Sequence, residues 1–413
     1  METLIERCCG LDVHQGSVVA CTMITERRRQ PRREIRTFGT MTKDLEALRD
    51  WLRDEGVTHV AMESTGIYWR PVHNLLHGSF VLIVANAHHI KNVPGRKTDV
   101  KDAEWIANLL RHGLINPSYV PIPEIGELRD LTRYRRKLVG TASAERNRTL
   151  KLLEMANIKL ASVAADVFGV SGLAMLRALA AGTATAAEMA GLARGRMRRK
   201  LAPLAAALDG RVTDHYRFLL SVALSRLDAF QRDIALLDQR IADKAAPYER
   251  QIALLMQIPG VDRLSAIAII AEVGVDLSHW PTARKLAAWA GLCPGNYESA
   301  GRAKGSAIRR GNVHLKAALY VAASAAAKRR GSYLKDKYHR LRARRGPRRA
   351  GIAIAHKILV SAYCMLTRDV GYQDLGDTYL DRLAEQRITR SLVRRLKGLG
   401  YDPSSTLGTV ERG

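Results

Sequence analysis

Several kinds of segment are scarce in this 413-residue chain, and each scarcity argues against a class of protein. No apolar run approaches the roughly 20 residues that cross a bilayer, and the N-terminus METLIERCCG lacks the apolar core of a signal peptide. The five cysteines form no CxxC pair and no finger spacing, which argues against zinc and favours reduced, buried thiols. We therefore expect a cytoplasmic protein with no membrane partner.

Acidic residues are also scarce in comparison with basic ones. Asp and Glu number 40 against 66 Lys and Arg, which gives a formal net charge of +26. A charge this large predicts a polyanionic partner, and without membrane features that partner is nucleic acid. Aromatic residues make up only 6% of a chain that is 47% hydrophobic, and the abundant alanine indicates closely packed helices.

The first 123 residues alternate strand-like and helix-like segments. Cys8–Val13 and Val18–Met23 predict an antiparallel hairpin around a turn at His14–Ser17. The segments that follow predict a strand at Glu34–Phe38, a helix at Thr42–Glu55, a strand at Thr58–Met62, a helix at Ile67–Leu76, a strand at Phe80–Ala85 and a helix ending near Leu110. This order is that of the α/β ribonuclease H-like (RuvC-like) fold, which we expect for residues 1–123.

Four acidic residues fall where this fold would gather them. Asp12 lies inside the first strand, Glu63 ends a strand that would neighbour it, and Asp99 and Asp102 share one face of a helix start. Taken singly, Asp12 suits a solvent-facing strand and Asp99 suits a helix cap. Four crowded carboxylates repel one another, and Mg²⁺ relieves that repulsion because hard cations take carboxylate oxygens. The set predicts metal-dependent attack on a phosphodiester.

Residues 124–246 are expected to form a basic helical and coiled-coil region that links the domains and dimerises. Arg129, Arg133 and Arg136 are met by few acids, which predicts contacts with nucleic acid. Further on, apolar residues spaced alternately four and three apart predict an a/d seam between subunits, the alternative being a long helix packed on its own domain. The seam residues are Tyr216, Leu220, Ala223, Leu227, Phe230, Ile234, Leu237 and Ile241.

Residues 247–371 are expected to form a mostly α-helical domain, followed by a helix and tail at 372–413. The turn Pro259–Asp262 resembles that of a helix-hairpin-helix, although a purely structural turn is the alternative. A glycine-rich loop at 294–305 carries Ser299. The basic residues expected to contact phosphate in this domain are Arg302, Lys304, Arg309, Arg310, Arg344 and Arg345.

Several motifs resemble the DEDD transposases of the insertion-sequence one-ten family, the bridge-RNA-guided recombinases. They are Gly10–His14, Met62–Gly66, Lys97–Ala103, Pro259–Val261, Leu286–Leu292, Ser299–Gly301 and Arg310–Asn312. The resemblance spans residues 8 to about 115 and 250 to about 330. The sequence departs from the family pattern at Asp262, Glu298 and Ala300.

The resemblance implies specific roles for five residues. Asp12, Glu63, Asp99 and Asp102 would form a metal-binding catalytic tetrad, and Ser299 would be a nucleophile that links covalently to DNA. It also implies a non-coding guide (bridge) RNA that pairs with donor and target DNA.

These observations lead us to expect an RNA-guided, Mg²⁺-dependent recombinase that excises and inserts its own element. It would work as a homodimer or homotetramer in the bacterial cytoplasm, at the nucleoid. One alternative is a RuvC-like nuclease or Holliday junction resolvase in which water attacks. Another is a non-catalytic nucleic-acid-binding scaffold. A sugar-kinase-like ATPase is disfavoured because the glycine-rich phosphate turn after the first strand is absent.

Overall fold

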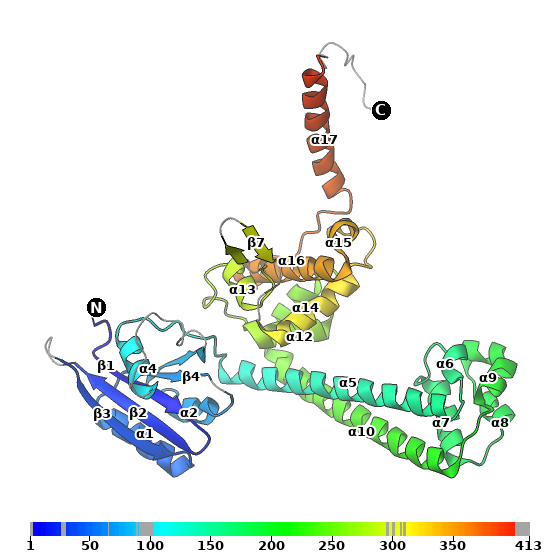
Figure 1. Ribbon diagram of the computed structural model, residues 1–413, viewed down its shortest axis with the longest axis horizontal. Coiled ribbons are helices and arrows are strands. Elements are labelled where there is room, and N and C mark those ends of the chain that lie inside the picture. Colours follow the sequence, from blue (N-terminus) through cyan, green and yellow to red (C-terminus); the bar gives the residue numbers. More distant parts are fainter. Residues whose placement is uncertain are drawn as a thin grey trace. The chain divides into compact units, whose positions relative to one another are not determined.

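The chain divides into two compact units, Met1–Val120 and Pro121–Gly413 (Figure 1). The computed structural model describes residues 3–25, 30–64, 66–87, 90, 102–294, 297–299, 302–305, 308 and 311–400. For residues 297–299, 302–305, 386 and 387 it describes the backbone alone.

The first unit is built on a five-stranded mixed sheet with strand order β3-β2-β1-β4-β5. The strands are β1 (Arg7–Val13), β2 (Ser17–Ile24), β3 (Arg32–Gly39), β4 (His59–Glu63) and β5 (Val81–Ala85). β1, β2 and β3 form an antiparallel meander, whereas β4 is parallel to β1 and β5 is parallel to β4. Every strand predicted for this unit is present, and the sheet is compatible with a ribonuclease H-like domain.

Helices cover both faces of this sheet. α1 (Thr42–Asp54) and α2 (Trp69–Leu76) pack on the face that carries Cys9 and Leu11. α4 (Asp102–Arg111) packs on the opposite face, against Cys8 and Ala61. Side chains alternate between the two faces along a strand, and in β1 and β4 the residues on both faces are largely apolar. Both sides of these strands are therefore buried.

The cysteines behave largely as the sequence predicts. All five thiols are free. Cys8, Cys9 and Cys21 are buried in the sheet, while Cys293 and Cys364 are only half-buried. Burial raises the pKa of Cys8 to about 12 and that of Cys21 to about 11, so both stay protonated at neutral pH.

Gly10 sets the distance between β1 and α4. A Cβ atom at this position would lie 2.3 Å from the Ala103 carbonyl oxygen and 2.3 Å from the Ala107 nitrogen. Both atoms belong to the helix backbone and cannot move aside singly. We therefore expect Gly10→Ala to push α4 off the sheet and to lower the free energy of unfolding by about 1–3 kcal/mol in urea titrations.

Gly16→Ala is the matched control, since nothing lies within 4 Å of a Cβ there. Equal urea midpoints for the two variants would contradict the close approach of β1 and α4.

The second unit begins with a long helical hairpin. α5 (Pro123–Met155) and α10 (Asp214–Ala245) pack side by side along their lengths (Figure 1). Between them the chain forms a helical cap, defined here as α6 (Leu160–Val163), α7 (Val170–Ala181), α8 (Ala186–Gly191), η1 (Gly195–Lys200) and α9 (Leu201–Leu208). Met175, Leu176 and Leu204 form its core with Leu220 and Leu224 of α10.

The predicted seam on α10 has two kinds of residue. Leu220, Ala223, Leu227 and Ile241 are buried within the chain. Tyr216 is half-buried against the core of the helical cap, and Phe230, Ile234 and Leu237, which lie between Leu227 and Ile241, are also only half-buried. Packing on the chain's own helices thus accounts for the buried positions, and a seam between subunits remains a proposal for the others.

The rest of the second unit is a helical bundle. Its helices are α11 (Glu249–Met256), α12 (Arg263–Val273), α13 (Ala283–Trp289), α14 (Val313–Ala326), α15 (Tyr333–Arg345) and α16 (Pro347–Arg368), followed by α17 (Tyr379–Gly398). Across the described part of the chain, α16 is the one helix long and apolar enough to cross a membrane by length and composition. Its buried residues, among them Ile354, Ile358 and Leu359, face neighbouring helices of the bundle.

The turn between α11 and α12 is shaped by packing. Gly260 has a φ of +86°, and a Cβ there would lie 2.3 Å from the Ala322 carbonyl oxygen of α14. Asp262 caps α12, because its Oδ1 accepts a hydrogen bond from the Ser265 amide at 2.8 Å. An amide that a helix-hairpin-helix could offer to phosphate is thus bonded to the chain's own carboxylate, which supports the structural alternative.

Candidate functional site

Asp12 and Glu63 leave neighbouring strands at the same edge of the sheet. β1 and β4 are parallel with Leu11 opposite Met62, so Asp12 and Glu63 come next on their strands. Because side chains alternate, both lie on the face of Gly10 and Ala61, which is the face that α4 covers. The sequence predicted this proximity from the fold, and the strand register provides it.

Asp102 lies at the start of the helix that crosses this face. α4 runs antiparallel to β1: Ala103 lies against Gly10, while the Arg111 carbonyl accepts hydrogen bonds from the amides of Leu4 and Ile5, just before β1. Its first residue, Asp102, therefore lies toward the strand ends that carry Asp12 and Glu63. The positive end of the helix dipole favours carboxylates there. Asp99, the fourth predicted ligand, is outside the described residues.

His14 is a residue of this edge whose role the sequence analysis missed. Its Nε2 lies 3.1 Å from Oδ2 of Asp12, whose side chain is 25% exposed. The two residues are two apart at the end of β1, a spacing that places side chains on one face, and that was the available signal. From the sequence, His14 belongs to a turn and to the motif Gly10–His14, and neither predicts its contact with Asp12.

An all-oxygen donor set at this edge suits a hard divalent cation such as Mg²⁺. Asp12, Glu63 and Asp102 share an edge and a face, which fits that chemistry. Over the ranges that the structure describes, which leave out Asp99, no three acidic, histidine or cysteine side chains are grouped closely enough to hold a metal.

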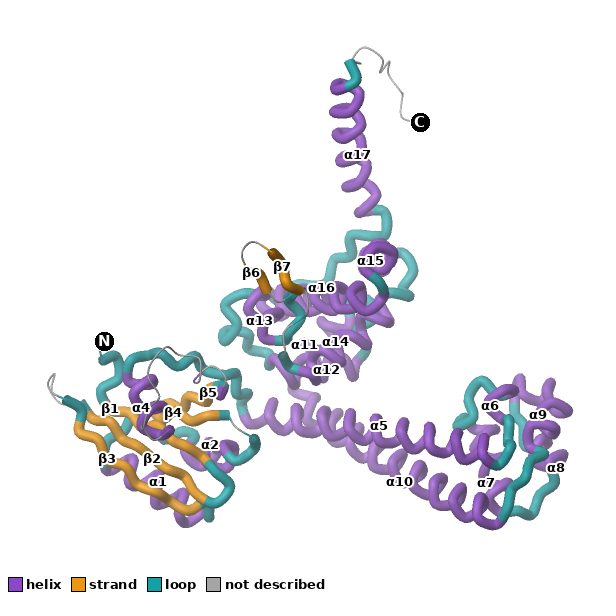
Figure 2. Tube along the Cα trace, in the orientation of Figure 1, coloured by secondary structure: helices purple, strands orange, loops and turns teal. Residues whose placement is uncertain are grey.

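Ser299 belongs to the second unit and lies on a β-hairpin. Residues 294–305, expected to be a loop, contain β6 (Tyr297–Ser299) paired antiparallel with β7 (Arg302–Gly305), and Figure 2 shows both strands in an otherwise helical unit. Ser299 ends β6 and pairs with Arg302. The expectation of a loop was therefore wrong for these two segments.

The base of this hairpin is tightly fixed. Pro294 pairs with Ile308 in an isolated bridge. Beside it, Gly311 lies against the end of α13, and a Cβ at Gly311 would be 2.4 Å from the Gly291 nitrogen. The next residue, Asn312, caps α14 by accepting hydrogen bonds from the amides of His314 and Leu315, both at 3.0 Å. Pro294 and Gly311, on either side of the hairpin in sequence, thus lie at the end of α13 and at the start of α14.

Glu272 connects this junction to α5. It is 2% exposed, and Arg133 donates to its two carboxylate oxygens, each at 2.7 Å. Asn312 Nδ2 donates to Oε2 at 2.6 Å. Burial opposes ionisation, but the hydrogen bonds and charge of Arg133, with Asn312 and Arg129, outweigh it and hold the pKa of Glu272 below its ordinary value. A lone acid inside the apolar run of α12 was the signal for this network, which the sequence analysis did not use.

Two of the arginines expected to bind nucleic acid are held by this network. Arg129 is 8% exposed and donates to the carbonyls of Ala271 at 2.9 Å and Glu272 at 3.0 Å. Arg133 makes the bidentate pair with Glu272. Both guanidinium groups thus have internal partners, so neither supports a phosphate contact.

The structure describes the other residues predicted to bind nucleic acid to different extents. Arg136 is exposed and donates to the Val313 carbonyl at 3.2 Å. Arg344 and Arg345 are exposed in the last turn of α15. Only the backbone of Arg302 and Lys304 is described, on β7, and Arg309 and Arg310 lie outside the described residues.

We expect Glu272→Ala to destabilise the second unit strongly. The substitution leaves the buried Arg129 and the half-buried Arg133 without their counter-charge, which costs about 3–5 kcal/mol of unfolding free energy. Because the pKa of Glu272 is lowered in the folded protein, its carboxylate stabilises the folded state fully at a pH above its unfolded pKa, near 4.3 for Glu. This stabilisation is lost as the pH falls through the folded pKa. The stability gap between wild type and variant, measured by urea titration near pH 7 and near pH 4, should therefore shrink on acidification.

Glu154→Ala provides the control for this prediction. Glu154 is 65% exposed and pairs with Lys159 on the surface, so its loss should cost no more than about 1 kcal/mol. A loss for Glu272→Ala as small as that of the control would show that the buried network does not hold the helices together.

Comparisons with known families cover both the acidic edge of the first unit and the Ser299 hairpin of the second. Residues 9–158 match the model of the DEDD transposases related to IS110, and residues 252–339 match the transposase family IS116/IS110/IS902. The first match contains Asp12, Glu63, Asp99 and Asp102, and the second contains Ser299. Residues 159–251 lie between the two. No curated protein matches the chain. Because the two matches together span more than half of the sequence, the chain belongs to the IS110 family of transposases.

Proposed function

We propose that the protein is a site-specific recombinase that excises and inserts its own DNA element. One observation carries the proposal: Asp12 and Glu63 leave adjacent parallel strands on one face, and the helix covering that face begins with Asp102. Rigid strand ends and a helix start are suitable supports for a catalytic group of carboxylates. The transposase family supplies DNA as the substrate.

In this proposal Asp12, Glu63, Asp99 and Asp102 would hold Mg²⁺, which when bound polarises a phosphodiester and stabilises negative charge. Ser299 supplies the nucleophile. Its Oγ forms a bond to phosphorus, a phosphorus–oxygen bond to a deoxyribose breaks, and the leaving oxygen takes up a proton. The phosphodiester energy is conserved in the serine–DNA ester, so rejoining needs no external energy source. Two basic residues of the same hairpin, Arg302 and Lys304 on β7, would stabilise charge on the attacked phosphate.

RNA guidance and assembly are further parts of the proposal. A guide RNA would pair with donor and target DNA, and the exposed guanidinium groups of Arg136, Arg344 and Arg345 support contacts with its phosphates. A homodimer or homotetramer would form through the half-buried seam positions Phe230, Ile234 and Leu237 of α10. The complex would act at the nucleoid of a bacterial cytoplasm.

The test is to trap the cleaved intermediate. Protein, Mg²⁺, co-purified RNA and DNA spanning the element's end are incubated, quenched in denaturant and separated by size. Protein-linked DNA that protease releases would support the proposal. Free DNA ends would favour the RuvC-like nuclease, in which the carboxylates of the first unit act with water. DNA binding without any cleavage would favour the alternative of a non-catalytic nucleic-acid-binding scaffold.

A further inference from the structure

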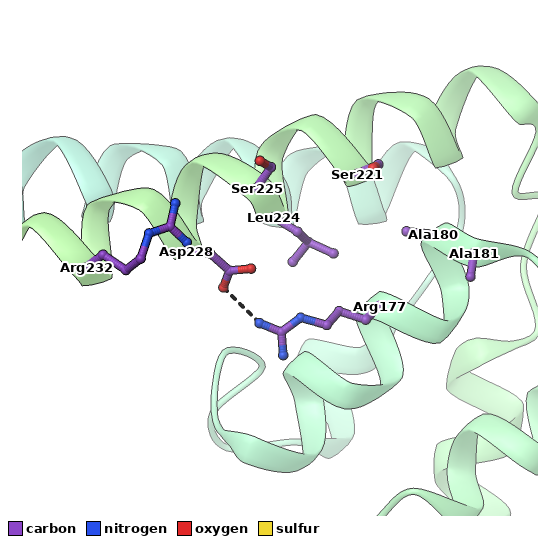
Figure 3. Close-up of a pocket in the computed structure, with 8 residues that line it drawn as sticks. All are labelled: Arg177, Ala180, Ala181, Ser221, Leu224, Ser225, Asp228 and Arg232. Carbon is purple, nitrogen blue, oxygen red and sulfur yellow. Dashed lines mark hydrogen bonds and ion pairs between the residues drawn. The ribbon is translucent and has the colours of Figure 1, made fainter.

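A polar groove lies in the helical cap, in the part of the chain between the two family matches. Figure 3 shows it between α7 and α10, with Leu224 beneath and polar side chains from both helices around it. Its volume is about 390 Å³, and a second cavity of about 360 Å³ continues along α10 from Asp228 and Arg232. The groove is therefore longer than one small-molecule pocket.

The groove carries positive charge that the protein itself does not neutralise. Arg177 donates to Asp228 at 2.8 Å, so these two charges cancel (Figure 3). Arg232 is exposed, and within the part of the chain that the structure describes it makes no ion pair.

Arg217 does not line the groove itself, but it lies beside Gly182, and Gly182 directly follows the lining residue Ala181. A Cβ at Gly182 would be 2.8 Å from Arg217 Nε, and that nitrogen is buried with no hydrogen-bond partner. As a residue Arg217 is half-buried, and in the described part of the chain no acidic side chain pairs with it.

The polar residues of α10 form one stripe along this groove. Arg217, Ser221, Ser225, Asp228 and Arg232 are spaced by four, four, three and four residues, which keeps them on one helix face. At 1.5 Å per residue the stripe spans roughly 22 Å from one guanidinium to the other. Its two ends are arginines and the positions between them include two exposed serine hydroxyls.

This arrangement matches the chemistry of a sugar–phosphate backbone. Guanidinium groups bind phosphate oxygens with paired hydrogen bonds, and serine hydroxyls donate to the same oxygens. No aromatic residue lines the groove, so stacking on bases, which single-stranded binding uses, is not provided here. The nearby cap surface has the same charge sign. Its exposed cations without an acidic partner are Arg194, Arg196, Arg198, Arg199 and Lys200.

We propose that the helical cap binds the phosphodiester backbone of a nucleic-acid duplex along the α7–α10 groove. Arg217 and Arg232 contact phosphates, and Ser221 and Ser225 hydrogen-bond between them. The cap thereby provides, at the end of the α5–α10 hairpin, a surface that binds nucleic acid independently of its sequence. This surface is distinct from the acidic edge and from the Ser299 hairpin. The inference does not rest on the catalytic proposal, since it concerns binding alone.

The test measures binding of the full-length protein to an RNA duplex and a DNA duplex of the same sequence, each of about 20 base pairs, over about 50 to 300 mM salt without Mg²⁺. In Arg217→Gln/Arg232→Gln we expect the Kd for at least one duplex to rise about tenfold near 100 mM salt. The slope of log K against log salt should fall by about 2, close to one unit for each lost phosphate contact. The duplex that responds identifies the ligand.

Two further variants make the result specific. Arg211→Gln/Arg240→Gln removes the same charge from exposed residues outside the groove and outside the basic surface of the cap, and should change the Kd less than about threefold. Ser225→Asp keeps both arginines but puts a negative charge into the groove, so it should weaken binding as the arginine pair does. Circular dichroism melts verify folding. Unchanged Kd and slope in the Arg217/Arg232 variant, an equal loss in the control pair, or no duplex binding by the wild type would each overturn the proposal.

Discussion

Ser299→Ala is expected to abolish DNA strand cleavage and exchange while leaving RNA and DNA binding intact. If Ser299 is the nucleophile, its loss removes the only atom that can form the protein–DNA ester, and the rate should fall by at least ~10³-fold. The substitution deletes one oxygen at the end of β6 and touches no backbone hydrogen bond of the hairpin. Its effect should therefore be separable from folding, because the base of the hairpin is fixed at Pro294, Ile308 and Gly311.

The assay is the denaturing trap, run with matched concentrations of wild type and variant. Ser324→Ala is the control, since Ser324 is an exposed serine of the same unit whose hydroxyl bonds only the Tyr320 carbonyl of its own helix. The control should retain covalent complex at the wild-type level. If Ser299→Ala cuts as fast as wild type, or if wild-type DNA ends carry no protein, serine is not the nucleophile.

The first unit could be predicted closely from the sequence because its signals are local. Alternating apolar residues mark each strand, and short turns set the order in which the strands pair. Once β1 and β4 are parallel neighbours, Asp12 and Glu63 must lie side by side. His14 was missed because a residue that follows a strand is read first as part of its turn, although it contacts Asp12.

The second unit was harder to predict because its determining contacts join residues far apart in sequence. Arg133 and Glu272 are separated by 139 residues. The sequence around Arg133 therefore does not reveal that α5 directs this arginine toward an acid inside the protein. β6 and β7 were missed because the glycines at 295, 301 and 305 weaken a strand pattern of only three and four residues. The heptad spacing on α10 predicts a long amphipathic helix correctly but cannot identify which helix covers it.

Asp12→Asn is expected to reduce cleavage by roughly 10²- to 10³-fold without weakening nucleic-acid binding. Asparagine keeps the size of the side chain and can still hydrogen-bond His14, so the packing of β1 is preserved. It removes one of the carboxylate charges that the proposed metal site needs. Glu46→Gln is the control, because Glu46 is an exposed acid of α1 in the same unit. Wild-type cleavage by Asp12→Asn, or an equal loss in Glu46→Gln, would contradict the assignment.

Thermal stability gives this prediction a readout independent of activity. If the carboxylates are gathered to bind a cation, they repel one another without it, so Asp12→Asn should be at least as stable as wild type in EDTA. Mg²⁺ should then raise the Tm of wild type and not that of the variant, because a ligand stabilises only the state that binds it. Asp102→Asn should lose the same Mg²⁺ response but also about 0.3–1 kcal/mol of helix-dipole stabilisation, since it is the first residue of α4. A Tm that responds equally to Mg²⁺ in all three proteins would show that these residues do not bind the metal, even if cleavage is lost.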